Sequence, residues 1–223
     1  MEAVLLDAHG TLVELRDPAA RLRDRLAAEG HTHPAERVEA ALAAEIRFYR
    51  RHHDRGRDAS SLADLRLDCA AVLAEGLGPD APPPGRLAEI LVESLRFELV
   101  ADALPALDDL AAAGLRLAVV SNWDAGLQAV LAGLGVADRF EAVVVSAVVG
   151  VGKPHPAIFA HALSALRVPA ARAVHCGDHP EYDCAGARAA GVRGVLIDRS
   201  DAHPDAACPR LRSLVDLPRL ILC

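Results

Sequence analysis

Short apolar runs alternate with segments of helical length through the second half of the chain, and this alternation is the feature that most restricts its fold. Each run suits a buried strand and is followed by a turn signal or a polar residue. Strands connected through helices form right-handed crossovers, and a series of crossovers builds a parallel sheet covered on both faces. We therefore predict an α/β fold with a doubly wound parallel sheet. The predicted strands are 3–6, 115–120, 142–145, 172–176 and 194–197, and the helices that alternate with the later strands are 104–113, 125–134, 156–166 and 181–190.

A helical stretch separates the first predicted strand from the second. Asp17 followed by Pro18 is typical of a helix start. Ser60 or Ser61 can cap a later helix, and the last helix of the stretch is predicted from about residue 86 to residue 99. We expect two domains: an α/β core formed by residues 1–13 and 102–223, and an inserted all-α cap domain formed by residues 14–101.

Polar side chains follow four of the predicted strands. Asp7 follows the first strand, and Ser121 and Asn122 follow the second. Lys153 and Asp178 come after the next two strands. Because the carboxyl ends of parallel strands meet at one edge of a sheet, we expect these side chains to converge on one crevice.

The side chains at these strand ends suit phosphoryl transfer. The carboxylates of Asp7 and Asp178, with a backbone carbonyl, make a hard oxygen site of the kind that Mg²⁺ prefers. A carboxylate can attack phosphorus and form an aspartyl-phosphate, which makes Asp7 our candidate nucleophile. Ser121, Asn122 and Lys153 can donate to the phosphoryl oxygens, where charge must be stabilised. Lys153 is the only lysine among 24 basic residues, which agrees with a need for a compact ammonium there.

These residues and their order resemble the haloacid dehalogenase-like (HAD) hydrolases. Asp7-Ala8-His9-Gly10-Thr11-Leu12 looks like the first motif of that family, Ser121-Asn122 the second, Lys153-Pro154 the third, and Gly177-Asp178 with Asp183 the fourth. The resemblance implies that Asp7 is the nucleophile. It also implies that Asp7, the backbone carbonyl of His9 and Asp178 hold Mg²⁺, and that Asp183 supports the metal site.

The same resemblance implies a helical cap of the type that closes over small substrates. Most relatives with such a cap are phosphatases of small metabolites. We therefore predict a Mg²⁺-dependent phosphatase of a small anionic phosphorylated metabolite, acting through an aspartyl-phosphate on Asp7.

His9 departs from the family pattern. Family phosphatases usually carry an aspartate at this position, which protonates the leaving group and then activates water. Imidazole has a reference pKa near 6.5, so His9 can do both jobs near neutral pH. Without that function, activity would be slow or limited to good leaving groups.

Two other functions stay open. A 2-haloacid dehalogenase of this family has an aromatic residue at the position of His9 and needs no metal, and Asp178 and Asp183 argue against it. A non-catalytic HAD-like binding domain would have lost its acid/base group.

Positive charge is densest around Arg47, Arg50 and Arg51 in the predicted cap. Arginine forks bind carboxylates and phosphates, so these side chains can select an anionic substrate. A solvated helix face is the plainer interpretation of such a run.

Several polar residues near the motifs are expected to have structural roles. Asp124 is expected to be the N-cap of the following helix. His175 and His179 flank Asp178, but imidazole is a poor ligand for a hard Mg²⁺ site. Cys176 and Cys184 are expected to pack in the core.

Composition limits the partners and the compartment. The net charge of −7 argues against nucleic-acid and anionic-membrane partners. We find no apolar leader and no run of membrane length, so we expect a cytoplasmic protein, either a monomer or a homodimer. Five cysteines with no C-x-x-C spacing favour reduced thiols, with neither zinc nor a disulfide.

Overall fold

The computed structural model describes residues 1–222 and divides into two compact units. One unit combines Met1–Glu14 with the chain from Glu98 onward, and the other is Leu15–Phe97. The first unit contains a parallel sheet, and the second is mostly helical.

The α/β unit is built on a six-stranded sheet in which each strand is parallel to its neighbours, in the order β5-β4-β1-β6-β7-β8. β1 lies between β4 and β6, and all of its residues are buried. The predicted doubly wound parallel sheet is thus confirmed, although the sequence pattern did not predict the short strand β8. The strands are β1 (Ala3–Leu6), β4 (Arg116–Ser121), β5 (Ala142–Val145), β6 (Ala173–Gly177), β7 (Arg193–Ile197) and β8 (Arg210–Leu211).

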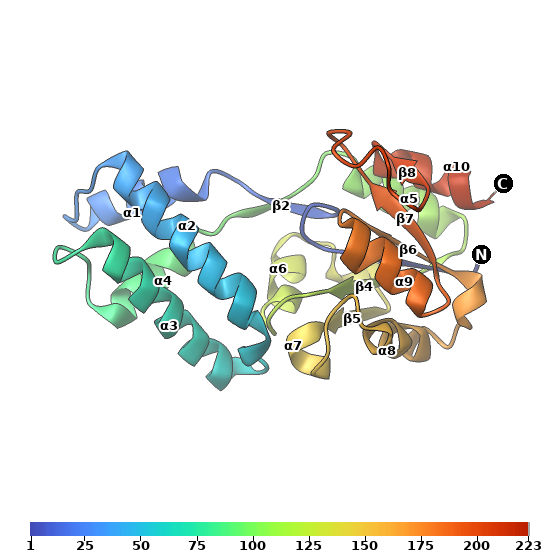
Figure 1. Ribbon diagram of the computed structural model, residues 1–223, viewed down its shortest axis with the longest axis horizontal. Helices are drawn as coiled ribbons and strands as arrows, with labels where there is room; N and C mark the ends of the chain where they lie inside the picture. The colour runs from blue at the N-terminus through green and yellow to red at the C-terminus, as the bar shows by residue number, and fades with distance from the viewer. Residues whose placement is uncertain (223) are drawn as a thin grey trace. The chain divides into compact units, whose positions relative to one another are not determined.

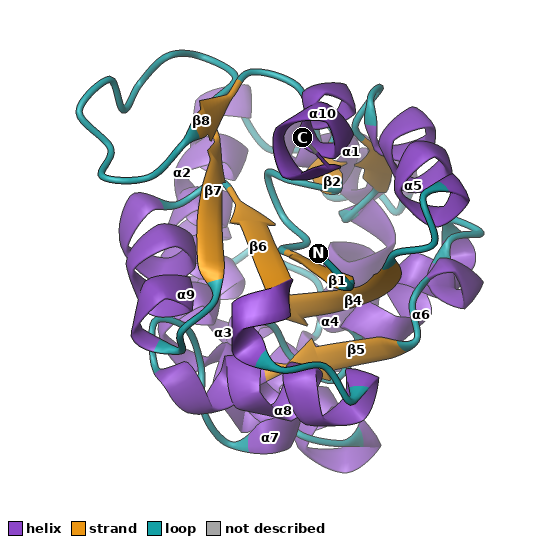
Figure 2. Ribbon diagram, turned by 90° about the vertical axis from the view of Figure 1, so that its right-hand side faces the viewer, coloured by secondary structure: helices purple, strands orange, loops and turns teal. Residues whose placement is uncertain are grey.

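Helices cover both faces of this sheet, with α8 and α9 on one side and α5 and α10 on the other (Figure 2). On the first face, Leu5 and Val120 belong to the same buried cluster as Phe159 of α8. Because neither face meets water, the strands are continuous apolar runs rather than alternating ones. The helices of this unit are α5 (Ala103–Ala112), α6 (Leu127–Gly133), α7 (Ser146–Val149), α8 (Pro156–Leu166), α9 (Gly186–Ala189) and α10 (Leu217–Leu222), with short 3₁₀ turns at Ala137–Arg139, Ala170–Arg172 and Leu214–Asp216.

The helical unit packs four α-helices around its own core, with α2 alongside α3 (Figure 1). The N-cap of α3 is Asp58, not Ser60 or Ser61 as predicted. The Asp58 carboxylate accepts from the Ser61 N–H at 2.9 Å, and the Asp58 N–H donates to Ser61 Oγ at 3.0 Å, so the two residues form a capping box. The helices are α1 (Pro18–Ala28), α2 (Ala35–His52), α3 (Ala59–Leu77) and α4 (Pro84–Ser94), with a 3₁₀ turn at His53–Arg55. No helix in the described part of the chain is both long enough and apolar enough to span a bilayer.

The helix predicted to run to residue 99 ends earlier. α4 stops at Ser94, and β3 (Phe97–Leu99) pairs with β2 (Val13–Leu15). The Val100 N–H donates to the Leu12 carbonyl at 3.0 Å, which extends this pairing. The prediction was wrong because a short apolar run suits a helix or a strand equally well, and only a pairing partner distant in sequence decides between them.

A disulfide joins Cys184 to Cys208, which corrects the expectation of reduced thiols only and of Cys184 as a packing residue. The loop between β7 and β8 returns to the helical segment that carries Cys184 and leaves the two Cα atoms 6.2 Å apart. This approach depends on the tertiary structure, because the two cysteines lie 24 positions apart in sequence. Cys69 and Cys176 are buried free thiols.

Candidate active site

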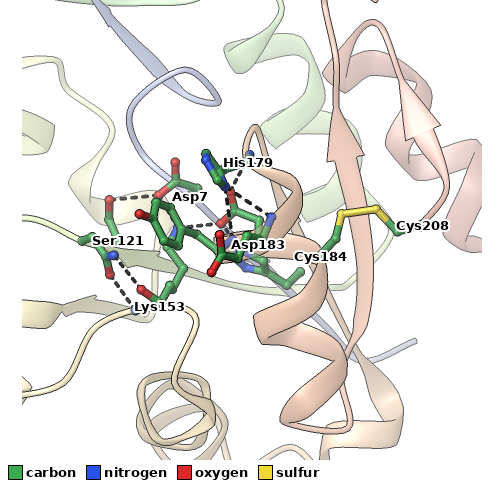
Figure 3. Close-up of polar contacts among 11 residues, drawn as sticks. Asp7, Ser121, Lys153, His179, Asp183, Cys184 and Cys208 are labelled. Carbon is green, nitrogen blue, oxygen red and sulfur yellow. Dashed lines mark hydrogen bonds and ion pairs between the residues drawn. A yellow bond between two sulfur atoms is a disulfide. The ribbon is translucent and has the colours of Figure 1, made fainter. Parts of the chain in front are cut away.

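The site lies at the carboxyl edge of the sheet, where the central strands end (Figure 3). Asp7 directly follows β1, Ser121 is the last residue of β4, and Asp178 directly follows β6. Lys153 lies in the loop after α7, and Asp183 lies in a π-helical segment, Pro180–Ala185. Parallel strands in the order β4-β1-β6 thus bring residues distant in sequence to one edge.

Lys153 forms the centre of a buried ion cluster. Its Nζ donates to Asp7 Oδ1 and to Asp183 Oδ1, both at 2.6 Å. Ser121 Oγ donates to the same Asp7 oxygen at 2.9 Å. Burial opposes the charge on Lys153, but the carboxylates of Asp7 and Asp183 outweigh it and raise the lysine pKa. The cluster therefore holds a fixed positive charge against the candidate nucleophile.

Asp178 completes a group of three carboxylates. One carboxylate oxygen from each of Asp7, Asp178 and Asp183 lies within 4.8 Å of the others. Burial, together with the negative charges of Asp7 and Asp183, raises the pKa of Asp178 to about 7. Excess negative charge at this point favours a bound cation.

The chemistry of this group fits a magnesium ion. All the side-chain donors are carboxylate oxygens, which are hard ligands. Gly10 leaves the space that the Asp178 carboxylate occupies, because a Cβ at position 10 would lie 2.2 Å from Asp178 Oδ2. The φ of Gly10 is +79°, a backbone conformation that favours glycine. Asp7 and Asp178 are the residues that would hold the ion. Coordination of the ion by the His9 backbone carbonyl stays a prediction.

Asn122 has a role that the sequence did not reveal. Its Nδ2 donates to the Lys153 carbonyl at 2.9 Å, and its Oδ1 accepts from the Lys153 N–H at 2.7 Å. A Cβ on Gly152 would lie 2.8 Å from Asn122 Oδ1, so glycine is needed for this approach. The Asn122 side chain thus fixes the backbone of Lys153, and its expected donation to a phosphoryl group stays a prediction.

His9 is exposed, and its ring centroid lies 6.4 Å from that of Trp123. Trp123 is itself buried, with 8% of its surface exposed. The expected acid/base role of His9 stays a prediction.

Asp124 differs from its predicted role. The N-cap residue of α6 is Gly126, and no side chain caps that helix. Asp124 Oδ1 instead accepts from the Gly126 N–H at 2.7 Å and closes the turn before the helix.

Two histidines that were expected to have only structural roles contact a carboxylate of the site. His175, on β6, is fully buried, and its Nε2 lies 2.8 Å from Asp183 Oδ1. The backbone N–H of His179 donates to Asp183 Oδ2 at 2.8 Å, and its ring Nδ1 accepts from two backbone N–H groups of the π-helical segment. A signal was present for His175, because it lies between apolar residues near the end of a predicted buried strand, where a polar side chain is uncommon.

Asp183 therefore has a partner on each oxygen. Lys153 and His175 hold its carboxylate in the charged form and lower its pKa, although burial acts in the opposite direction. A Cβ on Gly177 would lie 2.1 Å from Asp183 Cγ, so the glycine makes room for this carboxylate.

Arg47, Arg50 and Arg51 occupy exposed positions on α2, in the helical unit. Their expected part in substrate selection stays a prediction.

This arrangement has relatives among known proteins. A family model described as haloacid dehalogenase-like hydrolase matches residues 1–191. The chain is 40% identical over 126 residues to haloacid dehalogenase-like hydrolase domain-containing protein 3 of Danio rerio, across 55% of this chain and 52% of that protein. It is 36% identical over 154 residues to the phosphoserine phosphatase of Thermus thermophilus, across 64% of this chain and 62% of that enzyme.

Among solved structures, a 2-haloacid dehalogenase from Pseudomonas syringae pv. Tomato is similar over 100% of this chain and 98% of its own, with a TM-score of 0.72 and 28% identity. The curated relatives, in contrast, are matched over only 52% and 62% of their own lengths.

Proposed function

This chain belongs to the haloacid dehalogenase-like hydrolases, and from that premise we propose that it is a Mg²⁺-dependent phosphatase of a small phosphorylated metabolite. Relatives named phosphatases, such as the phosphoserine phosphatase of Thermus thermophilus, support hydrolysis of a phosphate ester. The substrate class, the metal and the covalent intermediate are parts of the proposal.

One observation carries the proposal. Lys153 Nζ lies 2.6 Å from both Asp7 and Asp183, in the same group of carboxylates as Asp178. A nucleophilic carboxylate needs a cation beside it if a phosphate dianion is to approach. Lys153 supplies one positive charge, and Mg²⁺ held by Asp7 and Asp178 would supply two more and neutralise charge on the phosphate.

The reaction is proposed to proceed in two displacements on one carboxylate. In the first, an oxygen of Asp7 attacks phosphorus, the ester bond breaks, and the leaving alcohol takes a proton. In the second, water attacks the aspartyl-phosphate and releases inorganic phosphate and free Asp7. Ser121 and Lys153, which contact Asp7 Oδ1, would donate to the phosphoryl oxygens as charge develops on them.

We assign proton transfer to His9. His9 is exposed and comes two residues after the proposed nucleophile. An imidazole is in general a stronger base than the carboxylate that is usual at this position. His9→Ala should slow hydrolysis of an alkyl phosphate at least about 100-fold, whereas an aryl phosphate with a good leaving group should change little in the first step. An equal effect on both substrates would exclude protonation of the leaving group by His9.

The central experiment is a screen of small phosphate esters with and without Mg²⁺, comparing the natural protein with Asp7→Asn. Asp7→Asn should abolish phosphate release, and a chelator should do the same to the natural protein. Asp109→Asn, an exposed carboxylate change on α5, is the matched control and should keep full activity. Equal activity in the Asp7→Asn and natural proteins would remove Asp7 from the mechanism.

Dehalogenation is the second candidate, because the full-length structural similarity to a 2-haloacid dehalogenase comes with 28% identity. It predicts halide release from 2-haloacids that a chelator does not affect. A non-catalytic binding domain would instead bind beryllium fluoride with Mg²⁺ and turn over none of the esters.

We further propose that the helical unit acts as the cap and that Arg47, Arg50 and Arg51 of α2 select an anionic substrate. Changing each of these arginines to Gln should raise KM and leave kcat nearly unchanged if they bind the substrate. Arg55, in the 3₁₀ turn that follows α2, pairs with Asp68 at 2.6 Å, so Arg55→Gln provides a control with a nearby arginine that already has a partner.

A further inference from the structure

The carboxylates of the site are not equivalent. Only 1% of the Asp183 surface is exposed, and each of its carboxylate oxygens has a hydrogen-bond donor beside it. Oδ1 accepts from Lys153 Nζ at 2.6 Å and lies 2.8 Å from His175 Nε2. Oδ2 accepts from the His179 N–H at 2.8 Å. A carboxylate accepts about four hydrogen bonds in all, so little of this one is left for a metal ion. Asp178, by contrast, is partly exposed.

His175 is an unusual donor. Its side chain is fully buried, it meets the edge of Phe159 at 5.0 Å between ring centroids, and its Nδ1 is buried without a hydrogen-bond partner in the described chain. A proton on Nδ1 would be buried without an acceptor, whereas a proton on Nε2 has Asp183 to receive it. The ring therefore donates to Asp183 from Nε2.

A buried imidazole with only one of its two ring nitrogens hydrogen-bonded lowers the stability of the fold. An apolar side chain at the same position in the strand would fill the space without that cost. Positions where a sequence keeps such a cost are expected at functional sites. The only polar contact of the His175 side chain in the described chain is the one to Asp183. Any role of the His175 ring nitrogens must therefore act through that carboxylate.

We propose that His175 is a positioning residue that keeps Asp183 as the partner of Lys153 and out of direct coordination of the metal ion. This proposal rests on the proposed function, because it concerns the same Mg²⁺ and the same lysine. With Asp183 engaged, Asp7 and Asp178 are the carboxylates left to hold the ion. Mg²⁺ demands octahedral coordination, and a small set of protein ligands leaves positions for water and a phosphoryl oxygen.

Removal of the donor should redistribute these contacts. In His175→Leu, Asp183 Oδ1 loses one of its two partners, and the freed oxygen can turn toward the cation. A third carboxylate ligand strengthens metal binding but takes a coordination position and draws Asp183 away from Lys153. Metal affinity and turnover should therefore change in opposite directions.

The test is titration of Mg²⁺ into the metal-free protein by calorimetry, without substrate, beside kcat for a phosphate ester. His175→Leu should tighten Mg²⁺ binding by about threefold or more and lower kcat by about tenfold or more. His175→Gln can place its amide N–H where Nε2 lies, so it should keep both values near those of the natural protein. Phe159→Leu, which alters the packing around the ring without touching Asp183, should change neither.

Three outcomes would overturn the proposal: Mg²⁺ binding that is unchanged or weaker in His175→Leu, a His175→Gln protein that behaves like His175→Leu, or a Phe159→Leu protein that reproduces the effect. A merely structural role for His175 predicts weaker metal binding together with lower activity. If His175→Leu does not fold, His175→Asn replaces it, because its shorter amide cannot reach Asp183. The calorimetric readout needs no turnover, so failure of the phosphatase proposal would be seen separately.

Discussion

Replacing Asp178 by Asn should stabilise the metal-free protein at pH 8. In the folded protein the Asp178 pKa rises from 3.8 to about 7, because the group is buried and because Asp7 and Asp183 are negatively charged nearby. This rise corresponds to a free energy of about 4 kcal/mol for keeping Asp178 ionised in the folded state. Asp178 is partly exposed, so solvent screens part of this energy and we expect about 2 kcal/mol. Asn keeps the shape of the side chain and removes the charge.

The sign of the pH dependence follows from the direction of the pKa change. A carboxyl group with a higher pKa in the folded protein than in the unfolded chain favours folding at low pH, where the folded state binds the extra proton. That stability is lost as the pH rises from 3.8 to about 7, the interval between the two pKa values. The advantage of Asp178→Asn should therefore be largest at pH 8 and less than about half as large at pH 5.

The assay is urea unfolding in the presence of a chelator, at pH 5 and pH 8. Trp123 is the only tryptophan in the chain and lies in the α/β unit, so its fluorescence reports unfolding of that unit. A gain of about 2 kcal/mol should also raise Tm by about 4 to 8 °C. The exposed change Asp109→Asn should leave stability unaltered, and saturating Mg²⁺ should erase the advantage of Asp178→Asn. An Asp178→Asn protein that is no more stable at pH 8, or that gains equally at both pH values, would refute the reasoning.

Three further predictions follow from the contacts of the site and of the disulfide. Lys153→Met should lower kcat at least about 100-fold and destabilise the α/β unit by about 3 kcal/mol or more in urea unfolding, because it leaves a buried carboxylate pair without its cation; recovery of activity in Lys153→Arg would contradict the need for a compact ammonium. Gly10→Ala should weaken Mg²⁺ binding by about tenfold in calorimetry, whereas Gly30→Ala, which also has a positive φ but open space around its Cβ position, should not change it. Cys208→Ser should lower the free energy of unfolding by about 2 to 4 kcal/mol, and reduction of the natural protein should give the same loss; an unchanged unfolding curve in both cases would show that the bond is not formed in solution.

Local patterns in the sequence were sufficient for the fold class and for the location of the site. Apolar runs that end in a polar residue and alternate with segments of helical length predict the buried strands of a parallel sheet and the residues at their ends. Because all parallel strands point the same way, Asp7, Ser121 and Asp178 had to meet at one edge of the sheet once the strands were recognised. The structure has the parallel sheet, with Asp7 directly after β1, Ser121 at the end of β4 and Asp178 directly after β6.

Other features depended on contacts between segments distant in sequence. Phe97–Leu99 is a strand because Val13–Leu15 lies beside it, and Asn122 serves Lys153 because two loops meet. The Cys184–Cys208 bond and the His175 contact to Asp183 belong to the same class. Sequence periodicity reports which face of an element is buried, but a hydrogen bond or a disulfide needs two particular atoms within bonding distance, and only the folded chain sets that distance.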